Sequence, residues 1–272
     1  MNLELENLHV LITGGSKGIG LACARGFLAE GARVTLVART VETLLSAQAS
    51  LTAMLVNAGM ASDATSRINV IAADLRDAAD AERAVETIER DYGPVDVLVN
   101  SAGAAKRTPA AELTAASWHD AMQAKFFTYI HVINPLIKKM GERGRGAVVN
   151  VIGSGGKVAA VTHLAGGAAN AALMLASAGF ASAYAAKGVR VNAVNPGLTL
   201  TERLHEGMQA EARQQGISME EALTRAKATR PLGRIAEPSE IADAVVYLAS
   251  NRASYITGAI VAMDGAVTPM VV

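Results

Sequence analysis

The sequence has little cysteine, few aromatic residues and no excess charge of either sign. Its 272 residues include one cysteine, Cys23, so no disulfide can form within the chain, which fits a reducing compartment. Cys23 lies in an apolar helical pattern and is expected to be buried. Lysine plus arginine equals aspartate plus glutamate, at 25 each, so the net charge indicates neither nucleic acid nor an anionic membrane as a partner.

No secretory signal pattern precedes the first apolar run, and we expect a cytoplasmic protein with a small-molecule substrate and no metal site. One run, 158–186, also lacks formal charge and is long enough to span a bilayer. More than half of it is alanine or glycine, and His163 and Asn170 interrupt it. We therefore expect a buried helix over about 164–186. Its small residues would pack against the same helix of a second subunit in a homodimer or homotetramer.

Short apolar, β-branched runs alternate with helical patterns along the whole chain. Strands that are apolar on both faces and separated by helices predict a parallel sheet covered on both sides. No linker or repeat divides the chain. We predict one doubly wound α/β Rossmann domain over residues 1–272, with a polar, charge-rich helix pair at about 198–232. The seven expected strands of the parallel sheet lie at 9–15, 33–39, 68–75, 95–103, 146–153, 189–197 and 257–265.

The turn after the first run reads TGGSKGIG, residues 13–20. Glycines at 14, 18 and 20 would let a pyrophosphate approach backbone N–H groups and the positive end of a helix. Glycines also serve ordinary turns, but this loop opens a βαβ unit, the context that dinucleotide binding requires. The second strand ends in Ala38, Arg39 and Thr40, where an acid would hold the ribose of NAD. Arg39 and Lys17 are either partners of a 2′-phosphate or solvated surface cations, and the missing acid favours NADP.

These motifs resemble those of the short-chain dehydrogenase/reductase family, of the 3-oxoacyl-reductase-like type, over essentially the whole chain. Asp74 and Leu75 resemble the family's adenine-contacting pair, Asn100–Gly103 resembles its Asn-Asn-Ala-Gly motif with one change, and Thr199 stands in place for the nicotinamide carboxamide. The resemblance, with the glycine loop, assigns the cofactor to Gly14, Ser16, Lys17, Gly18, Ile19, Gly20, Arg39, Thr40, Asp74, Leu75, Asn100, Ala102, Gly103, Pro196, Gly197 and Thr199.

The resemblance also implies a substrate lid at about 198–232, and hydride transfer between a nicotinamide and a carbonyl or alcohol, supported by serine, tyrosine, lysine and asparagine. Here the serine position holds Gly153, the tyrosine position Gly166, the lysine position Asn170 and the asparagine position Lys125. Ser154 comes one residue late. The family's asparagine and lysine are thus exchanged between two helices. The missing tyrosine leaves a volume for a larger substrate, for water or for neighbouring side chains.

Four residues are candidates for the chemistry, each with a structural alternative. Lys125 is an acid–base with a lowered pKa, or a surface lysine. His163 transfers a proton, or is a polar neighbour of a helix start. Ser154 donates to a carbonyl, or serves a turn. Asn170 keeps a polar group at the former lysine position.

Three functions remain open. The first is an atypical NADP-dependent oxidoreductase whose proton comes from Lys125, His163 or the substrate. The second is an NADP-binding protein without redox activity that acts as a sensor, scaffold or partner subunit. The third is a lyase, isomerase or other non-redox enzyme. The intact nucleotide motifs support the first two equally. We favour the first, because hydride transfer belongs to the cofactor and the protein mostly positions it.

Overall fold

The computed structural model describes residues 2–60, 64–103 and 105–269. A single seven-stranded sheet, in the order β3-β2-β1-β4-β5-β6-β7, runs through it, and every neighbouring pair is parallel. This confirms the predicted fold class. The strands are β1 His9–Thr13, β2 Arg33–Ala38, β3 Ile68–Ala72, β4 Val97–Asn100, β5 Gly146–Val151, β6 Val189–Pro196 and β7 Ile260–Met263.

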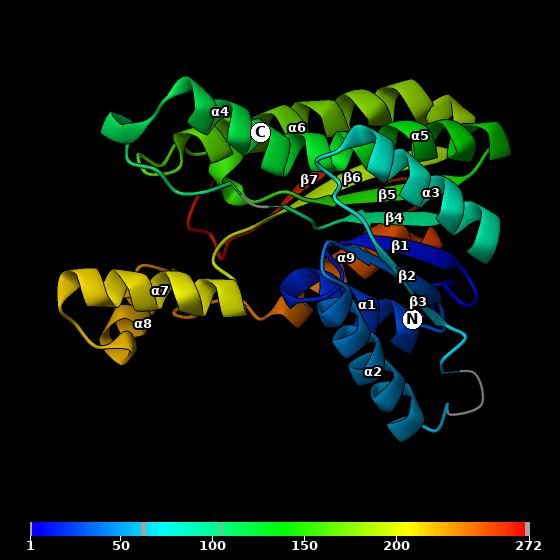
Figure 1. The fold of residues 1–272 in the computed structure, drawn as a ribbon, viewed down its shortest axis with the longest axis horizontal. Helices are drawn as coiled ribbons and strands as arrows, with labels where there is room; N and C mark the ends of the chain where they lie inside the picture. The colour runs from blue at the N-terminus through cyan, green and yellow to red at the C-terminus, as the bar shows by residue number, and fades with distance from the viewer. Residues whose placement is uncertain (1, 61–63, 104, 270–272) are drawn as a thin grey trace.

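Helices cover both faces of the sheet (Figure 1). One face carries α1 Gly18–Ala29, α2 Val41–Asn57 and α9 Pro238–Ala249, and the other carries α3 Ala78–Tyr92, α4 Ala115–Ala121, α5 Thr128–Arg143 and α6 Leu164–Tyr184. The two faces pack into two hydrophobic clusters, which is why the central strands are apolar on both sides. Cys23 is buried in the first cluster, as predicted, and burial raises the pKa of its thiol to about 12.

The strand order reverses between β1 and β4, so the loops that follow these two strands diverge and leave a crevice at the carboxyl ends. The glycine loop between β1 and α1 lies at this reversal. After β6, the chain forms α7 Glu202–Gln215 and α8 Met219–Ala228, a helix pair with a small core of its own around Met208, Ala212 and Ala222. The pair extends beyond the sheet in Figure 1, within the segment expected to be a lid.

The helical segment from α4 to α5 is interrupted in its middle. Between α4 and α5 the backbone widens into a π-helical turn, η2, over Met122–Phe127. Such turns insert an extra residue into a helix, and they occur frequently at functional sites. Lys125 lies within this turn. Gly103 (φ +82°), in the loop after β4, lies so close that a Cβ atom on it would overlap the carbonyl oxygen of Ala124.

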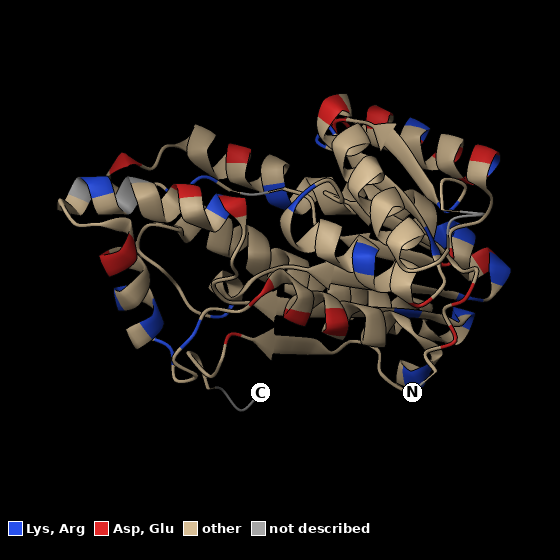
Figure 2. Ribbon diagram, turned by 90° about the horizontal axis from the view of Figure 1, so that it is seen from below, with Lys and Arg blue, Asp and Glu red and all other residues tan. Residues whose placement is uncertain are grey.

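The segment Leu164–Lys187, which consists of α6 and its final turn, is the one helix in the described part of the chain that is long and apolar enough to cross a membrane. Its inner side packs on the sheet through Leu173, Met174 and Ala181, as expected for a helix of the protein core. The outer side remains exposed and includes Leu175, which is 77% exposed. Elsewhere, lysines and arginines alternate with aspartates and glutamates along the outer helices (Figure 2).

Candidate active site

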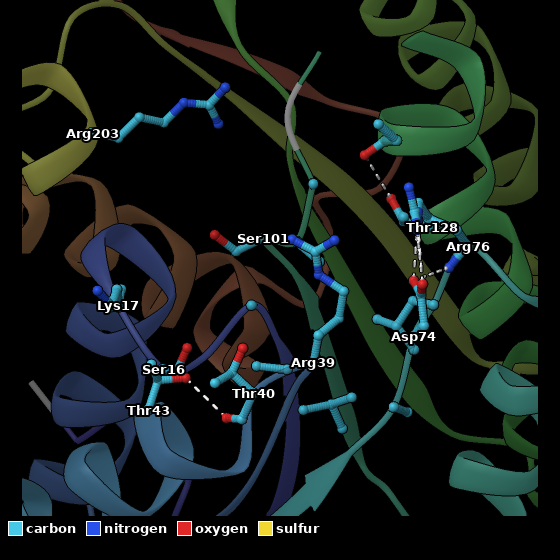
Figure 3. A pocket seen from close by; sticks show the side chains of 18 residues that line it. Ser16, Lys17, Arg39, Thr40, Thr43, Asp74, Arg76, Ser101, Thr128 and Arg203 are labelled. Carbon is cyan, nitrogen blue, oxygen red and sulfur yellow. Dashed lines mark hydrogen bonds and ion pairs between the residues drawn. The ribbon is translucent and has the colours of Figure 1, made fainter. Parts of the chain in front are cut away.

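A cavity of about 660 Å³ lies at the carboxyl ends of β1 to β4 (Figure 3). The glycine loop forms one wall and the ends of β2, β3 and β4 form the others. Nine of the residues expected to hold a cofactor border it: Gly14, Ser16, Lys17, Arg39, Thr40, Asp74, Leu75, Ala102 and Gly103.

The glycine loop packs against neighbouring backbone more closely than other residues allow. Gly14 has a φ of +66°, and a Cβ atom on it would lie 2.8 Å from Cα of Ala102. A Cβ atom on Gly20 would overlap the carbonyl oxygen of Gly14. The missing side chains therefore keep the strand–helix turn tight and leave its backbone bare towards the cavity. A bare turn before a helix N-terminus fits the pyrophosphate of a dinucleotide.

The cations at this cavity differ in their partners. Lys17 Nζ lies 3.0 Å from Glu202 Oε2 at the start of α7, and both side chains are exposed, so the pair adds little stability. Arg39 borders the cavity and has no hydrogen bond or ion pair with any residue that the structure describes. Its side chain extends over the cavity in Figure 3.

Arg76 is a cation that sequence reasoning overlooked. Its guanidinium lies 3.0 Å from Asp74 Oδ2, and this contact lowers the pKa of the Asp74 carboxyl. Both residues border the cavity at the end of β3. Its position two residues after Asp74 was the available signal.

Asn100 lies behind the cavity wall, with a fully buried side chain that is no part of the cavity lining. Its Oδ1 accepts a hydrogen bond from Thr13 Oγ1, and its Nδ2 donates to Asn150 Oδ1 at 3.0 Å. Asn150 in turn donates to Ser177 on α6. This chain of polar groups joins the ends of β1, β4 and β5 to α6. The side chain of Asn100 therefore holds the strand ends together, and its assignment to the cofactor stays a prediction.

The other predicted cofactor residues border adjoining spaces. Gly18, Ile19, Pro196 and Gly197 line a cavity that also includes Ser101 and Gly103, residues of the first one. Thr199 is buried and lies under the helix pair, where its hydroxyl donates to the carbonyl oxygen of Gly197 at 3.4 Å.

A second cavity, of about 550 Å³, meets the first at Gly103 and Arg203. All four candidate catalytic residues, from three separate segments of the chain, border it: Lys125, Ser154, His163 and Asn170. Gly153 and Gly166, which the sequence predicts at the family's serine and tyrosine positions, border it too.

Lys125 is buried, which contradicts the alternative of a surface lysine. Its Nζ donates to the carbonyl oxygen of Val151 at 3.1 Å and to the hydroxyl of Tyr129 at 2.8 Å. The Tyr129 hydroxyl donates to the same carbonyl, and burial raises its pKa. Burial, with the positive charge of Arg203 as a smaller cause, lowers the pKa of Lys125 from 10.5 to about 7. The ammonium form therefore gives up a proton near neutral pH.

The imidazole of His163 fills the space beside Gly166. A Cβ atom on Gly166 would overlap Cε1 of that ring and lie 2.6 Å from Nε2. The ring is partly buried, and its Nδ1 has no hydrogen-bond partner among the described residues. Desolvation, followed by the charges of Arg107, Arg203 and Lys125, lowers the pKa of His163. The imidazole is therefore neutral at pH 7.

Close packing joins the turn after β5 to the start of α6. The turn η3, Ser154–Gly156, follows Gly153, whose φ of +124° is a conformation that side chains rarely adopt. A Cβ atom on Gly153 would lie 3.4 Å from Nδ2 of Asn170, whose buried side chain has no hydrogen-bond partner in the described chain. The Asn170 amide is thus free to bind a group inside the cavity. Ser154 borders the same space.

Comparisons with known proteins agree with this architecture. A family model described as enoyl-(acyl carrier protein) reductase matches residues 14–268. The chain is 32% identical to D-threitol dehydrogenase of Mycolicibacterium smegmatis, over 98% of this chain and 95% of that protein. Its fold is similar to that of L-sorbose reductase from Gluconobacter frateurii complexed with NADPH and L-sorbose, with a TM-score of 0.90, 28% identity and full coverage of both chains.

A third similar protein is an NADPH-bound short-chain oxidoreductase from Pseudomonas aeruginosa PAO1, which is described as containing an atypical catalytic center. The TM-score is 0.85 and the identity 30%, over 98% of this chain and all of that one. The family match covers nearly the whole chain, and two relatives at 30% identity or above are covered almost completely. The chain belongs to the short-chain dehydrogenase/reductase family.

Proposed function

We propose that this chain is an atypical NADP(H)-dependent oxidoreductase that reduces a carbonyl compound to an alcohol, or catalyses the reverse reaction, with Lys125 as its proton donor. The observation that carries this proposal is the pair of adjoining cavities. The first cavity has the glycine loop as one wall, which suits a dinucleotide. The second cavity adjoins it and is bordered by Lys125 and His163. The site is atypical because the family's serine, tyrosine and lysine positions hold Gly153, Gly166 and Asn170.

NADP is favoured over NAD by the charge around the first cavity. Arg39 stands at the end of β2, where an acid would bind the ribose hydroxyls of NAD, and it forms no ion pair with a described residue, although its charge acts on Asp74. A guanidinium there would bind the 2′-phosphate of NADP. Two of the similar structures described above contain NADPH. When bound, NADPH supplies the hydride, which becomes a C–H bond at the carbonyl carbon.

Lys125 supplies the proton. An ammonium group carries three N–H donors, and two of them are bound by the carbonyl oxygen of Val151 and the hydroxyl of Tyr129. The third is the proton that passes to the carbonyl oxygen. The amine that remains keeps both hydrogen bonds, so the side chain holds its position through the reaction. A pKa of about 7 suits a general acid at neutral pH.

His163 and Asn170 position the substrate. A neutral imidazole has one N–H donor, and the Nε2 side of His163 lies at the cavity, where it would donate to the carbonyl oxygen. The Asn170 amide, without a partner in the described chain, offers a second donor. These two groups orient the carbonyl, and the adjacent ammonium stabilises the negative charge that develops on its oxygen.

We further propose that the enzyme is a cytoplasmic homodimer or homotetramer. The outer face of α6 carries Ala168, Ala171, Leu175, Gly179 and Ser182, all exposed and uncharged. Their spacing of three or four residues aligns them along one side of the helix. A face of this kind fits a two-fold interface with the same helix of a second subunit. The helix pair α7–α8 would then act as the lid over the substrate cavity.

The test is NADPH oxidation against ketones, quinones and 3-oxoacyl thioesters. We expect turnover with at least one class, and a fall of about 10²- to 10⁴-fold for Lys125→Met with NADPH binding retained. Lys138→Met is the matched control, because Lys138 is exposed on α5 and borders neither cavity. Tight NADPH binding without turnover on any compound would instead indicate a binding protein. Activity that survives Lys125→Met combined with His163→Ala would exclude both proposed roles.

A further inference from the structure

The formal charges around the second cavity are all positive. Lys106, Arg107, Lys125 and Arg203 border it, and no aspartate or glutamate is among the residues that line it. The chain as a whole carries equal numbers of acids and bases, so this one-sided distribution is a local feature. A cavity whose walls carry charge of one sign attracts ligands of the opposite sign.

Arg107 and Arg203 approach the cavity from different elements, the loop after β4 and the first turn of α7. Neither guanidinium has a hydrogen bond or ion pair with any described residue, whereas Arg234 on the outer surface makes a double contact with Glu240. Desolvation and then the charge of Arg107 lower the pKa of Arg203, and the nearby Glu206 acts in the opposite direction. The neighbouring charges of the two arginines repel each other, and an anion bound between them reduces that cost.

The positive lining continues under the helix pair. A third cavity, of about 640 Å³, shares Arg107 and Arg203 with the second and adds Arg225 and Arg230. Arg225 is paired with Glu221, but Nε of Arg230 is buried without a hydrogen-bond partner in the part of the chain that the structure describes. An unpartnered buried donor is unfavourable unless a ligand satisfies it. The unpartnered donor of Arg230 therefore lies in the third cavity, which Lys125 does not border.

We propose that the substrate carries an anionic group, a carboxylate or a phosphate, which the guanidinium groups of Arg107 and Arg203 bind while its carbonyl lies at Lys125 and His163. The inference rests on the proposed reductase function for the reacting end of the molecule. Guanidinium groups bind planar carboxylates and phosphates through paired hydrogen bonds, and two of them on separate elements fix the direction in which a substrate enters.

Arg203 also borders the cofactor cavity, and in Figure 3 its side chain extends from α7 towards that space. It could therefore bind a phosphate of the cofactor instead of the substrate. A variant of Arg107 distinguishes these two ligands, because Arg107 borders the second and third cavities but not the cofactor cavity. A change at Arg107 should alter the KM for an anionic substrate and leave the KM for NADPH unchanged.

The experiment compares carbonyl compounds that differ in one charged group. 3-Oxo acids are compared with their methyl esters, 5-keto-D-gluconate with L-sorbose, and dihydroxyacetone phosphate with dihydroxyacetone. The sugar pair differs only by a carboxylate in place of a CH₂OH group, and the last pair tests phosphate. NADPH oxidation is measured for the wild type, Arg107→Gln, Arg203→Gln and the control Arg213→Gln. Arg213 is exposed on α7 and borders none of the three cavities.

We expect kcat/KM to be at least about tenfold higher for the charged member of a pair. Arg107→Gln should raise the KM of that member by about 10- to 100-fold, with little effect on its neutral partner, and Arg213→Gln should change neither. Whether the preferred pair carries carboxylate or phosphate identifies the group. Equal turnover of charged and neutral members, unaffected by Arg107→Gln, would overturn the inference and leave the reductase function intact.

A binding measurement separates the two proposals if no compound is reduced. Calorimetric titration of the NADPH-loaded protein with the charged compounds measures their dissociation constants and does not require catalysis. Binding that Arg107→Gln abolishes and Arg213→Gln retains would support the anion site while the reductase proposal fails. If no charged compound binds in an Arg107-dependent way, the anion site is refuted as well.

Discussion

The imidazole of His163 occupies the space that a side chain at position 166 would take. A Cβ atom on Gly166 would overlap Cε1 of the ring and would also lie 2.8 Å from Cβ of Ala105. The space beside Gly166, the predicted tyrosine position of the family, is therefore filled by His163, the residue that precedes the first turn of α6. The site keeps a titratable ring near the expected place, but on a different backbone position.

Gly166→Ala should displace the His163 ring, because the added methyl group cannot share its space. We expect kcat/KM to fall as far as it does in His163→Ala, with NADPH binding unchanged. Steady-state kinetics of the two single variants and the double variant measure this. If they act through the same ring, the double variant is no worse than either single variant.

Gly179→Ala is the control for that change. Gly179 lies on the outer face of the same helix, where a Cβ atom would meet nothing within 4 Å inside the subunit, and alanine keeps the proposed interface small and uncharged. Alanine is favoured over glycine in a helix by about 1 kcal/mol, so this variant should be slightly more stable and fully active. Full activity of Gly166→Ala, with the ring displaced, would remove His163 from the site's chemistry.

Lys125→Met should stabilise the protein at low pH. Between about pH 7 and 10.5 the unfolded chain holds a proton on Lys125 that the folded chain has lost, so the free energy of unfolding of the wild type rises with pH in this window. Below pH 7 both states are charged, and the folded state bears the full cost of burying the ammonium. Methionine carries no charge and has no such cost.

The stability difference between Lys125→Met and the wild type should therefore shrink as pH rises from 7 towards 10, by at most about 4 kcal/mol. Urea unfolding at several pH values measures it. A difference that stays constant over this range would mean that the pKa of Lys125 is not lowered in the folded protein.

Arg39→Asp should shift the cofactor preference from NADPH to NADH. The carboxylate would repel a 2′-phosphate and accept hydrogen bonds from the ribose hydroxyls of NADH. We expect Lys17→Gln to change the KM for NADPH less, because Glu202 already pairs with Lys17. Dissociation constants for both cofactors, from NAD(P)H fluorescence, measure the shift. An unchanged preference in Arg39→Asp would show that another cation, such as Arg76, binds the phosphate.

Leu175→Glu should dissociate the proposed oligomer, since it places a charge in the middle of the uncharged face of α6. Leu232→Glu is the matched control: this leucine is also exposed, at 64%, but lies outside α6. Light scattering after size-exclusion chromatography gives the mass of each variant. An unchanged mass for Leu175→Glu would rule out this helix as the interface.

Much of this architecture was predictable from local patterns. The strands were visible as β-branched runs, because central parallel strands are buried on both faces, and the glycine loop was visible because its close approach to Ala102 excludes side chains. Matching positions to the family pointed to Lys125, and the titratable ring of His163 made that residue a candidate. The structure adds that they border one cavity.

Other features depended on contacts between distant segments. Asn100 resembles a cofactor residue in the motif, but its partner Asn150 lies fifty positions further along the chain, and only the folded sheet joins them. Arg107 and Arg203 are ordinary surface arginines in sequence and become a pair only when α7 packs near the loop after β4. From the sequence, the volume beside Gly166 could hold substrate, water or a neighbouring side chain. In the folded chain, the ring of His163 occupies it.

The most direct test of the central claim is the pH dependence of kcat for carbonyl reduction. If Lys125 donates the proton, kcat of the wild type should fall above about pH 7 as the ammonium is lost, and this limb should be absent from the low residual activity of Lys125→Met. A limb that persists unchanged in Lys125→Met, or a wild-type kcat that is flat between about pH 5 and 9, would contradict the account.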